Sequence, residues 1–223
     1  MKTVAVIAAY NEEDRIVESI NDASAFVDAV VVVDDCSTDR TRHRAASTGV
    51  HVLHHLINRG QGAALQTGMD YALQKLQADI IVHFDADGQM QGSDIPALLE
   101  PIVSGAFEIA LGSRFLGRAE QIPVHRRLLL KLAIVFTFLT SGLWLSDTHN
   151  GFRALSAKAA RTLHITLDRM AHATELIEQM AVYRLSFLEV PVTIRYSART
   201  LAKGQKSSAL VHIALDILKD KIL

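Results

Sequence analysis

Short apolar runs alternate with amphipathic stretches along the first 113 residues. The apolar runs have the length of β-strands and occupy residues 4–8, 29–33, 50–54, 80–84 and 109–111. The stretches between them have helical spacing and occupy residues 13–26, 39–47, 62–77 and 93–103. Apolar strands that alternate with helices predict an α/β fold, a mostly parallel sheet with helices on both faces.

The second half has longer helical patterns. We expect a basic-headed apolar helix at 124–145, a polar loop at 147–153, an amphipathic helix at 173–185, a strand at 187–196, a basic loop at 197–208 and a C-terminal amphipathic helix at about 208–223. Pro191 favours an edge position for that strand. We expect a single domain over residues 1–223, because neither a linker nor a repeat interrupts it.

Polar residues follow the predicted strands at 10–12, 34–35, 58–60 and 85–89. Right-handed crossovers place the carboxyl ends of parallel strands on one edge of the sheet, where ligands bind in such folds. This recurrence predicts an active edge.

The strongest of these signals is Asp85-Ala86-Asp87. Alternate residues of an extended chain point the same way, so the two carboxylates converge and repel unless a cation or proton lies between them. Oxygen ligands with open positions suit Mg²⁺ or Mn²⁺, and Gln89 could add a third oxygen. A solvated turn is the alternative, but the place at a strand end favours a metal.

Two further motifs follow strands. Asp34 and Asp35 precede a helix start, and one of them could accept hydrogen bonds from a nucleobase or ribose. The segment 58–62 is a glycine turn before a helix but is no phosphate-binding loop, so we attribute it to packing and leave a ligand contact open.

Charge is unevenly distributed. Residues 1–113 hold 7 Lys+Arg against 16 Asp+Glu, and residues 114–223 hold 16 against 8. Arg114 follows a strand, and Arg126 and Arg127 head the apolar helix at 124–145. Guanidinium groups bind phosphates, which indicates an anionic partner. The helix at 124–145, like the one at 208–223, could lie in a membrane interface, where Arg126 and Arg127 could hold a lipid phosphate. Attraction between the two halves, or a buried helix with snorkelling ends, is the alternative.

No apolar stretch reaches the ~20 residues that span a bilayer. The single cysteine, Cys36, fits a reducing compartment. We therefore expect a cytoplasmic protein, peripheral at a membrane surface and without a nucleic-acid partner; self-association stays open.

Taken together, these motifs resemble the family 2 inverting glycosyltransferases of GT-A fold, and among them the dolichol- or polyprenyl-phosphate sugar transferases. The resemblance spans about residues 3–200 and rests on the segments 9–13, 33–37, 58–60, 85–89, 112–114 and 147–153.

The resemblance implies a role for each matching residue. Asp85, Asp87 and Gln89 would hold Mg²⁺ or Mn²⁺, and Asp87 and Asp147 would be catalytic. The substrate-binding residues would be Ala8, Tyr10, Glu12, Val33, Asp35, Ala86, Arg114, Arg126, Arg127, Arg199 and Lys206. The donor would be a UDP- or GDP-sugar, held by residues 1–113, and the acceptor a polyprenyl phosphate, bound by residues 114–223.

Some positions depart from the family's pattern. Ala8 replaces a frequent proline, and Thr148-His149-Asn150 replaces the more usual Pro-Thr-Ser. The spacing from Arg199 to Lys206 is one residue longer than expected, so Lys203 could take the role of Lys206. The Gln-x-x-Arg-Trp motif of processive synthases is absent, which favours transfer of a single sugar.

The acceptor decides which residues the chemistry needs. A lipid phosphate needs no strong base, whereas a saccharide hydroxyl needs a carboxylate, for which Asp147 and then Glu175 are the candidates. A sugar-nucleotide pyrophosphorylase is disfavoured because no glycine-rich basic loop follows the first strand. A non-catalytic membrane-associated binding protein is disfavoured by the full Asp85, Asp87 and Gln89 set.

Overall fold

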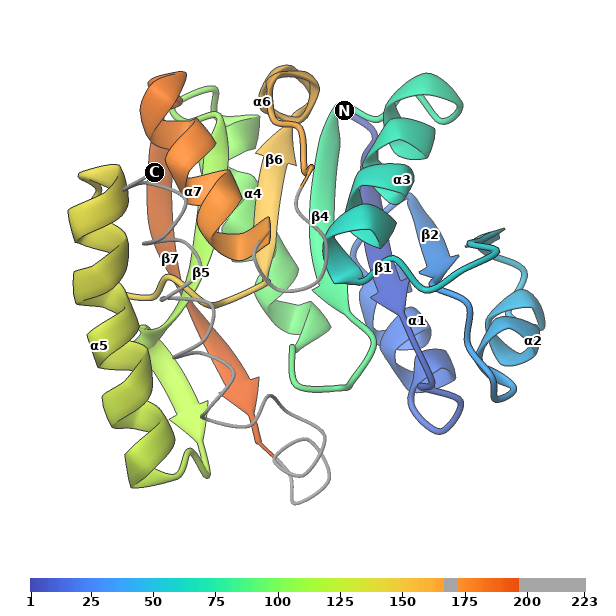
Figure 1. Cartoon of the computed structure of the whole chain (residues 1–223). Coiled ribbons are helices and arrows are strands. Elements are labelled where there is room, and N and C mark those ends of the chain that lie inside the picture. Colours follow the sequence, from blue (N-terminus) through green and yellow to red (C-terminus); the bar gives the residue numbers. More distant parts are fainter. Residues whose placement is uncertain (167–171, 197–223) are drawn as a thin grey trace.

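The computed structural model describes residues 1–166 and 172–196, which form one sheet with helical layers (Figure 1). The strands are β1 (Thr3–Ala9), β2 (Ala29–Asp34), β3 (His51–His54), β4 (Ile80–Asp85), β5 (Ile109–Glu120), β6 (Arg153–Ser156) and β7 (Phe187–Arg195). The helices are α1 (Ile16–Ser24), α2 (Thr41–Ala46), α3 (Gln61–Gln74), α4 (Ile95–Val103), α5 (Val124–Ser141), α6 (Ala157–Thr162) and α7 (His172–Val182), with a 3-10 turn η1 (Gly92–Asp94) before α4.

The strand order in the sheet is β3-β2-β1-β4-β6-β5-β7. Only β6 runs antiparallel to its neighbours β4 and β5, and the other pairs are parallel. The expected mostly parallel α/β sheet is therefore confirmed. Residues beyond 113 add β6 and β7 to the sheet that the first half begins, and Pro191 lies in the edge strand β7, as its missing N–H predicts.

Alternation along the strands divides the core into two layers. Ala5 and Ile7 of β1 face α1 and α4, whereas Val4 and Val6 face α3. The first layer also receives α2, and the second receives α6 and α7. Both faces of the sheet are therefore covered, and its polar side chains concentrate at the strand ends.

Helix α5 lies at the β5–β7 end of the sheet, next to α7 (Figure 1). It ends at Ser141 because Gly142 takes a left-handed φ of 74° and donates its N–H to Phe138. The predicted helix at 124–145 is thus four residues too long. The predicted helix at 208–223 lies outside the described residues.

Several boundaries differ from the sequence prediction. The predicted loop at 147–153 leads into β6 and α6, which the sequence pattern does not reveal because four and six residues are too few to show a period. The predicted strand at 109–111 continues to Glu120, since it pairs with β7 across an irregularity between Ser113 and Arg118. Helix α1 begins at Ile16 rather than at the predicted residue 13. The residues before it form a turn, in which the Glu12 carbonyl accepts hydrogen bonds from the N–H groups of Arg15 and Ile16.

Candidate active site

Three parallel strand ends meet at the predicted edge. Ala8 of β1 is in register with Val33 of β2 on one side and with Asp85 of β4 on the other. Ala86 follows Asp85 and is buried, and its carbonyl accepts a hydrogen bond from Ser19 of α1 at 3.0 Å. The sheet register therefore brings together predicted site residues that are far apart in the sequence.

The carboxylates of Asp85 and Asp87 lie close enough to repel one another. Burial, and then the charge of Asp87, raise the pKa of Asp85 to about 7, against the opposing charges of Arg153 and Arg114 and a hydrogen bond from Gln61. Two converging carboxylates of this kind favour a proton or a cation between them. The donor set therefore fits a divalent cation.

The set is also small. The described part of the chain has no cluster of three or more His, Cys, Asp or Glu side chains suited to a metal. Two carboxylates and an amide leave positions open for waters and substrate phosphates, as Mg²⁺ sites typically do. Gln89 donates from its backbone N–H and its Nε2 to the two oxygens of Asp87, at 3.0 and 2.6 Å, so its Oε1 is the side-chain atom that could face a cation.

The loop after β1 is joined to the loop after β2. Asn11, at a φ of 54°, donates its N–H to Ser37 Oγ at 2.9 Å, and its Oδ1 accepts from the N–H of Thr38. The N–H of Glu12 donates to Thr41 Oγ1 at 2.7 Å. Tyr10 projects from this loop with 45% of its surface exposed, which leaves its ring available for stacking.

Asp35 is buried and fully engaged. One carboxylate oxygen accepts from His55 Nδ1 at 2.7 Å and from the Arg59 N–H at 2.9 Å, and the other accepts from the Gly60 N–H at 2.6 Å. His55 Nε2 lies 2.9 Å from Thr67 Oγ1 on α3. Asp35 therefore fixes the glycine turn at 58–60, in agreement with the packing role expected for that turn. Its contact with a nucleotide stays a prediction.

Arg114 and Asp147 form a buried ion pair. Asp147 Oδ2 accepts from the Arg114 N–H at 3.0 Å and from its Nε at 2.6 Å. The other guanidinium nitrogens donate to the Tyr196 hydroxyl and, at 2.7 Å, to the His149 carbonyl. The structure thus uses Arg114 to hold Asp147, and its predicted contact with phosphate stays a prediction.

The remaining predicted cations lie toward α5. The Arg126 guanidinium stands 5.0 Å from the centre of the Tyr196 ring, and Arg127 is exposed on the first turn of α5. Tyr196 therefore links Arg126 to the Arg114–Asp147 pair. Arg199, Lys203 and Lys206 lie outside the described residues.

The fold brings to this edge three further residues whose place the sequence pattern does not predict. Gln61 begins α3 and donates to Asp85, Tyr196 directly follows β7, and Arg153 begins β6. Arg153 is 4% exposed, and burial lowers its pKa to about 10 against the opposing charges of Asp85 and Asp147. The only signal in the sequence was its place in the polar stretch 147–153, because the pairing of β6 with β4 is a long-range contact.

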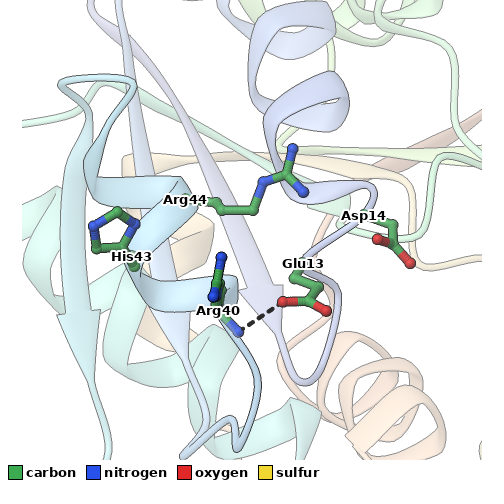
Figure 2. A pocket seen from close by; sticks show the side chains of 5 residues that line it. All are labelled: Glu13, Asp14, Arg40, His43 and Arg44. Atoms are coloured by element: carbon green, nitrogen blue, oxygen red, sulfur yellow. Dashed lines mark hydrogen bonds between the residues drawn. The ribbon is translucent and has the colours of Figure 1, made fainter.

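Figure 2 shows a surface pocket beside the segments that follow β1 and β2. It is lined by Glu13, Asp14, Arg40, His43 and Arg44. The Arg40 N–H donates to Glu13 at 3.0 Å. None of the predicted site residues lines this pocket, which is therefore separate from the paired carboxylates.

No described helix is both long and apolar enough to cross a membrane. The exposed side of α5 nevertheless carries a row of apolar residues beside the exposed Arg127 and Lys131. These apolar residues are Val124, Leu128, Leu132, Val135 and Leu139, each between 47% and 84% exposed. Their spacing of three or four residues places them on one face of the helix.

Several known proteins resemble this chain in sequence or in fold. The sequence profile described as "Glycosyl transferase family 2" matches residues 4–163. An uncharacterised protein of Methanocaldococcus jannaschii is 32% identical, over 97% of this chain and 91% of the relative. The UDP-N-acetylglucosamine–dolichyl-phosphate N-acetylglucosaminyltransferase of Methanococcus voltae is 30% identical, over 89% and 88%.

The undecaprenyl-phosphate mannosyltransferase of Micrococcus luteus is 28% identical, over 95% of this chain and 90% of the relative. Among solved structures, glucosyl-3-phosphoglycerate synthase of Mycobacterium tuberculosis in complex with Mn²⁺, UDP and phosphoglyceric acid has a TM-score of 0.72 at 19% identity, over 96% of this chain and 78% of that one. That likeness confirms the GT-A fold. With the profile match and the 32% identical relative, it establishes that the chain belongs to glycosyl transferase family 2 and is a glycosyltransferase.

Proposed function

We propose that the protein transfers one sugar, with inversion, from a nucleotide-sugar to a polyprenyl or dolichyl phosphate in a reaction that depends on a divalent cation. The observation that carries the proposal is the pair of converging carboxylates, Asp85 and Asp87, at the end of β4 in a family 2 chain. Mg²⁺ and Mn²⁺ both suit this donor set.

The donor would lie across the ends of β1, β2 and β4. The exposed ring of Tyr10 can stack on a base, and Glu12 and Asp35 lie on the loops that follow β1 and β2. A solved structure of this fold contains Mn²⁺ together with UDP, which supports a UDP-sugar, and a GDP-sugar is the alternative. Ala8, Val33 and Ala86 would line the floor of this site.

Asp85, Asp87 and Gln89 would hold the cation, which when bound supplies positive charge to the departing nucleoside diphosphate. Asp147, held by Arg114, would lie near the reacting sugar. Arg126 and Arg127, with Arg199 and Lys206, would bind phosphate groups of the acceptor or donor, since guanidinium and ammonium groups pair with phosphate.

The acceptor is inferred from chemistry and from relatives. The printed names of the Methanococcus voltae and Micrococcus luteus relatives specify dolichyl phosphate and undecaprenyl phosphate. A phosphomonoester with a second pKa of about 6 is largely ionised at neutral pH, so it can attack the sugar without a strong base. Such a lipid lies in a membrane, and the exposed apolar face of α5 suits contact with a membrane surface, which we propose to be its cytoplasmic face.

A saccharide hydroxyl is the second candidate acceptor. Asp147 Oδ1 is buried and has no hydrogen-bond partner among the described residues. A hydroxyl acceptor would need such a carboxylate oxygen to receive its proton. The two acceptors therefore differ in how much they depend on Asp147.

The donor and cation can be identified first. We expect thermal unfolding to shift upward with one class among UDP-, GDP- and CDP-sugars, and only when Mn²⁺ or Mg²⁺ is present. Transfer assays on a short-chain polyprenyl phosphate would follow with that donor. Absence of transfer, with no stabilisation by any nucleotide-sugar, would contradict the proposed function.

Two substitutions then separate the acceptors. Asp87→Ala should abolish transfer because it removes a cation ligand. Asp147→Asn keeps the shape of the side chain and an oxygen for Arg114, so it should retain more activity if the acceptor is a phosphate. Complete loss of activity in both variants would favour the hydroxyl acceptor.

A further inference from the structure

The first residue of α3 contacts a predicted cation ligand. Gln61 Nε2 donates a hydrogen bond to Asp85 Oδ1 at 2.9 Å, although 24 residues separate them in the sequence. The glycine turn at 58–60 aims the helix start at the end of β4, with Gly60 at a φ of 91° that favours glycine. The proposed function gives this turn and its helix no role.

The backbone that carries Gln61 is held from two sides. Asp35 of the β2 end accepts hydrogen bonds from the N–H groups of Arg59 and Gly60, directly before Gln61. Farther along α3, a Cβ on Gly68 would stand only 2.3 Å from Val6 Cγ1, so the helix packs closely on β1. The Gln61 side chain therefore starts from a fixed position.

The backbone of Gly151 also confines the Asp85 carboxylate. A Cβ on Gly151 would lie 3.1 Å from Asp85 Oδ2 and 3.3 Å from Oδ1, so backbone without a side chain packs against the carboxylate. The Asp85 N–H donates to Met90 Sδ at 3.2 Å. Between the amide of Gln61 and the backbone of Gly151, the carboxylate has little freedom to rotate.

We propose that Gln61 is a positioning residue for the cation site: its amide holds Oδ1 of Asp85, so that Oδ2 is presented to the divalent cation. This inference rests on the proposed function, in which Asp85 is a cation ligand. Carboxylates that bind metals are generally oriented by a hydrogen bond from a second residue, and loss of that partner typically weakens metal binding about 10- to 100-fold.

The alternative is that Gln61 only fastens α3 to β4. A fastening role would change the stability of the cation-free protein and leave cation affinity unaltered. Loss of a positioning role would weaken cation binding and leave the stability of the cation-free protein unaltered. An isosteric side chain can fill the same space without orienting the carboxylate.

The test is a titration of Mn²⁺ in the presence of UDP and, separately, of GDP, monitored by the electron paramagnetic resonance signal of free Mn²⁺. The variants are Gln61→Met, which keeps the length of the side chain and removes the amide, and Gln61→Ala as a second removal of the donor. Gln74→Leu is the matched control, because Gln74 is an exposed glutamine at the other end of α3. Thermal unfolding in EDTA checks that each variant is folded.

We expect Gln61→Met and Gln61→Ala to bind Mn²⁺ about 10- to 100-fold more weakly than the wild type, and Gln74→Leu to match it. Wild-type affinity in Gln61→Met, or an equal loss in Gln74→Leu, would overturn the positioning role. A lower melting temperature in EDTA with unchanged Mn²⁺ affinity would identify Gln61 as purely structural. If the wild type itself binds no Mn²⁺ with either UDP or GDP, the proposed cation site is wrong, and the inference falls with it.

Discussion

At the scale of single residues, the sequence identified Asp85 and Asp87 because their spacing alone makes the carboxylates converge. It could not identify what surrounds them. Gln61 and Gly151 reach Asp85 from distant parts of the chain, and neither belongs to a local pattern that signals a site. Residue chemistry is local, whereas the environment that tunes it is assembled by the fold.

Gly151 provides a direct test of how closely the Asp85 carboxylate is confined. In Gly151→Ala the new methyl group would stand 3.1 Å from Asp85 Oδ2 and push the carboxylate from its position. The carboxylate must move by a few tenths of an ångström to make room. Since displacement of a reacting or ligating group by about 1 Å can cost roughly 100-fold in rate, we expect a smaller loss in kcat/KM, on the order of several-fold. Donor consumption measures the loss, and unchanged activity in the folded variant would show that the contact relaxes freely.

His83 predicts a pH dependence of stability. Burial, with the charges of Arg153 on β6 and His172 on α7, lowers the pKa of His83 to about 3, and neither ring nitrogen has a hydrogen-bond partner among the described residues. Below pH 6.5, His83 therefore binds a proton in the unfolded chain but not in the folded chain. The free energy of unfolding consequently falls as the pH drops toward 3.

Between pH 6.5 and pH 5 this one group should remove up to about 2 kcal/mol of unfolding free energy. In His83→Leu that part of the pH dependence should disappear, whereas His164→Leu, at an exposed position, should keep it. Urea unfolding at pH 7 and pH 5 measures both variants. Equal pH dependence in His83→Leu and the wild type would show that His83 accepts a proton in the folded state.

At the scale of elements, the sequence pattern located β1 to β4, β7, α1 to α5 and α7, but not β6, α6 or the outer part of β5. The apolar strands have a local signature because both of their faces are buried. By contrast, β6 has four residues and exists because β4 and β5 pair with it on either side. Strand pairing of this kind depends on contacts between residues distant in sequence.

The packing of α3 on β1 can be tested at Gly68. Alanine stabilises most helices by about 1 kcal/mol relative to glycine. Here its Cβ would stand 2.3 Å from Val6 Cγ1 and 3.2 Å from Val33 Cγ2, and such overpacking costs about 1–3 kcal/mol. We expect Gly68→Ala to lower the free energy of unfolding in urea, with Gln74→Ala as an exposed control on the same helix. A more stable Gly68→Ala would show that α3 can move away from the sheet.

At the scale of the whole molecule, the acidic first half and the basic second half of the sequence contribute strands to the same sheet. The acidic first half supplies the paired carboxylates, and the basic second half supplies Arg114, Arg126 and Arg127 at the β5–β7 side. Helix α5 covers that side and turns an apolar stripe outward. This arrangement suits an acceptor whose phosphate enters the site while its hydrocarbon remains in a membrane.

Membrane contact through α5 predicts a specific loss of binding. Leu132 and Leu139 are 60% and 75% exposed, and a carboxylate at either position would oppose insertion into the interface. Leu132→Glu combined with Leu139→Glu should reduce sedimentation with vesicles that contain anionic lipid, while consumption of the donor in solution persists. Val103→Glu, at an exposed apolar residue of α4, is the control. Equal sedimentation of all these proteins would contradict the role of α5.

By itself the sequence determined the α/β class, the sheet with helices on both faces, and the convergence of Asp85 and Asp87 at a strand end, because strand and helix periods and the spacing of two carboxylates are local properties. The tertiary structure alone decided that β6 enters the sheet antiparallel, that Arg114 holds Asp147, and that Gln61 meets Asp85. Each of these contacts joins residues more than twenty positions apart, and their geometry depends on register and packing rather than on neighbouring residues.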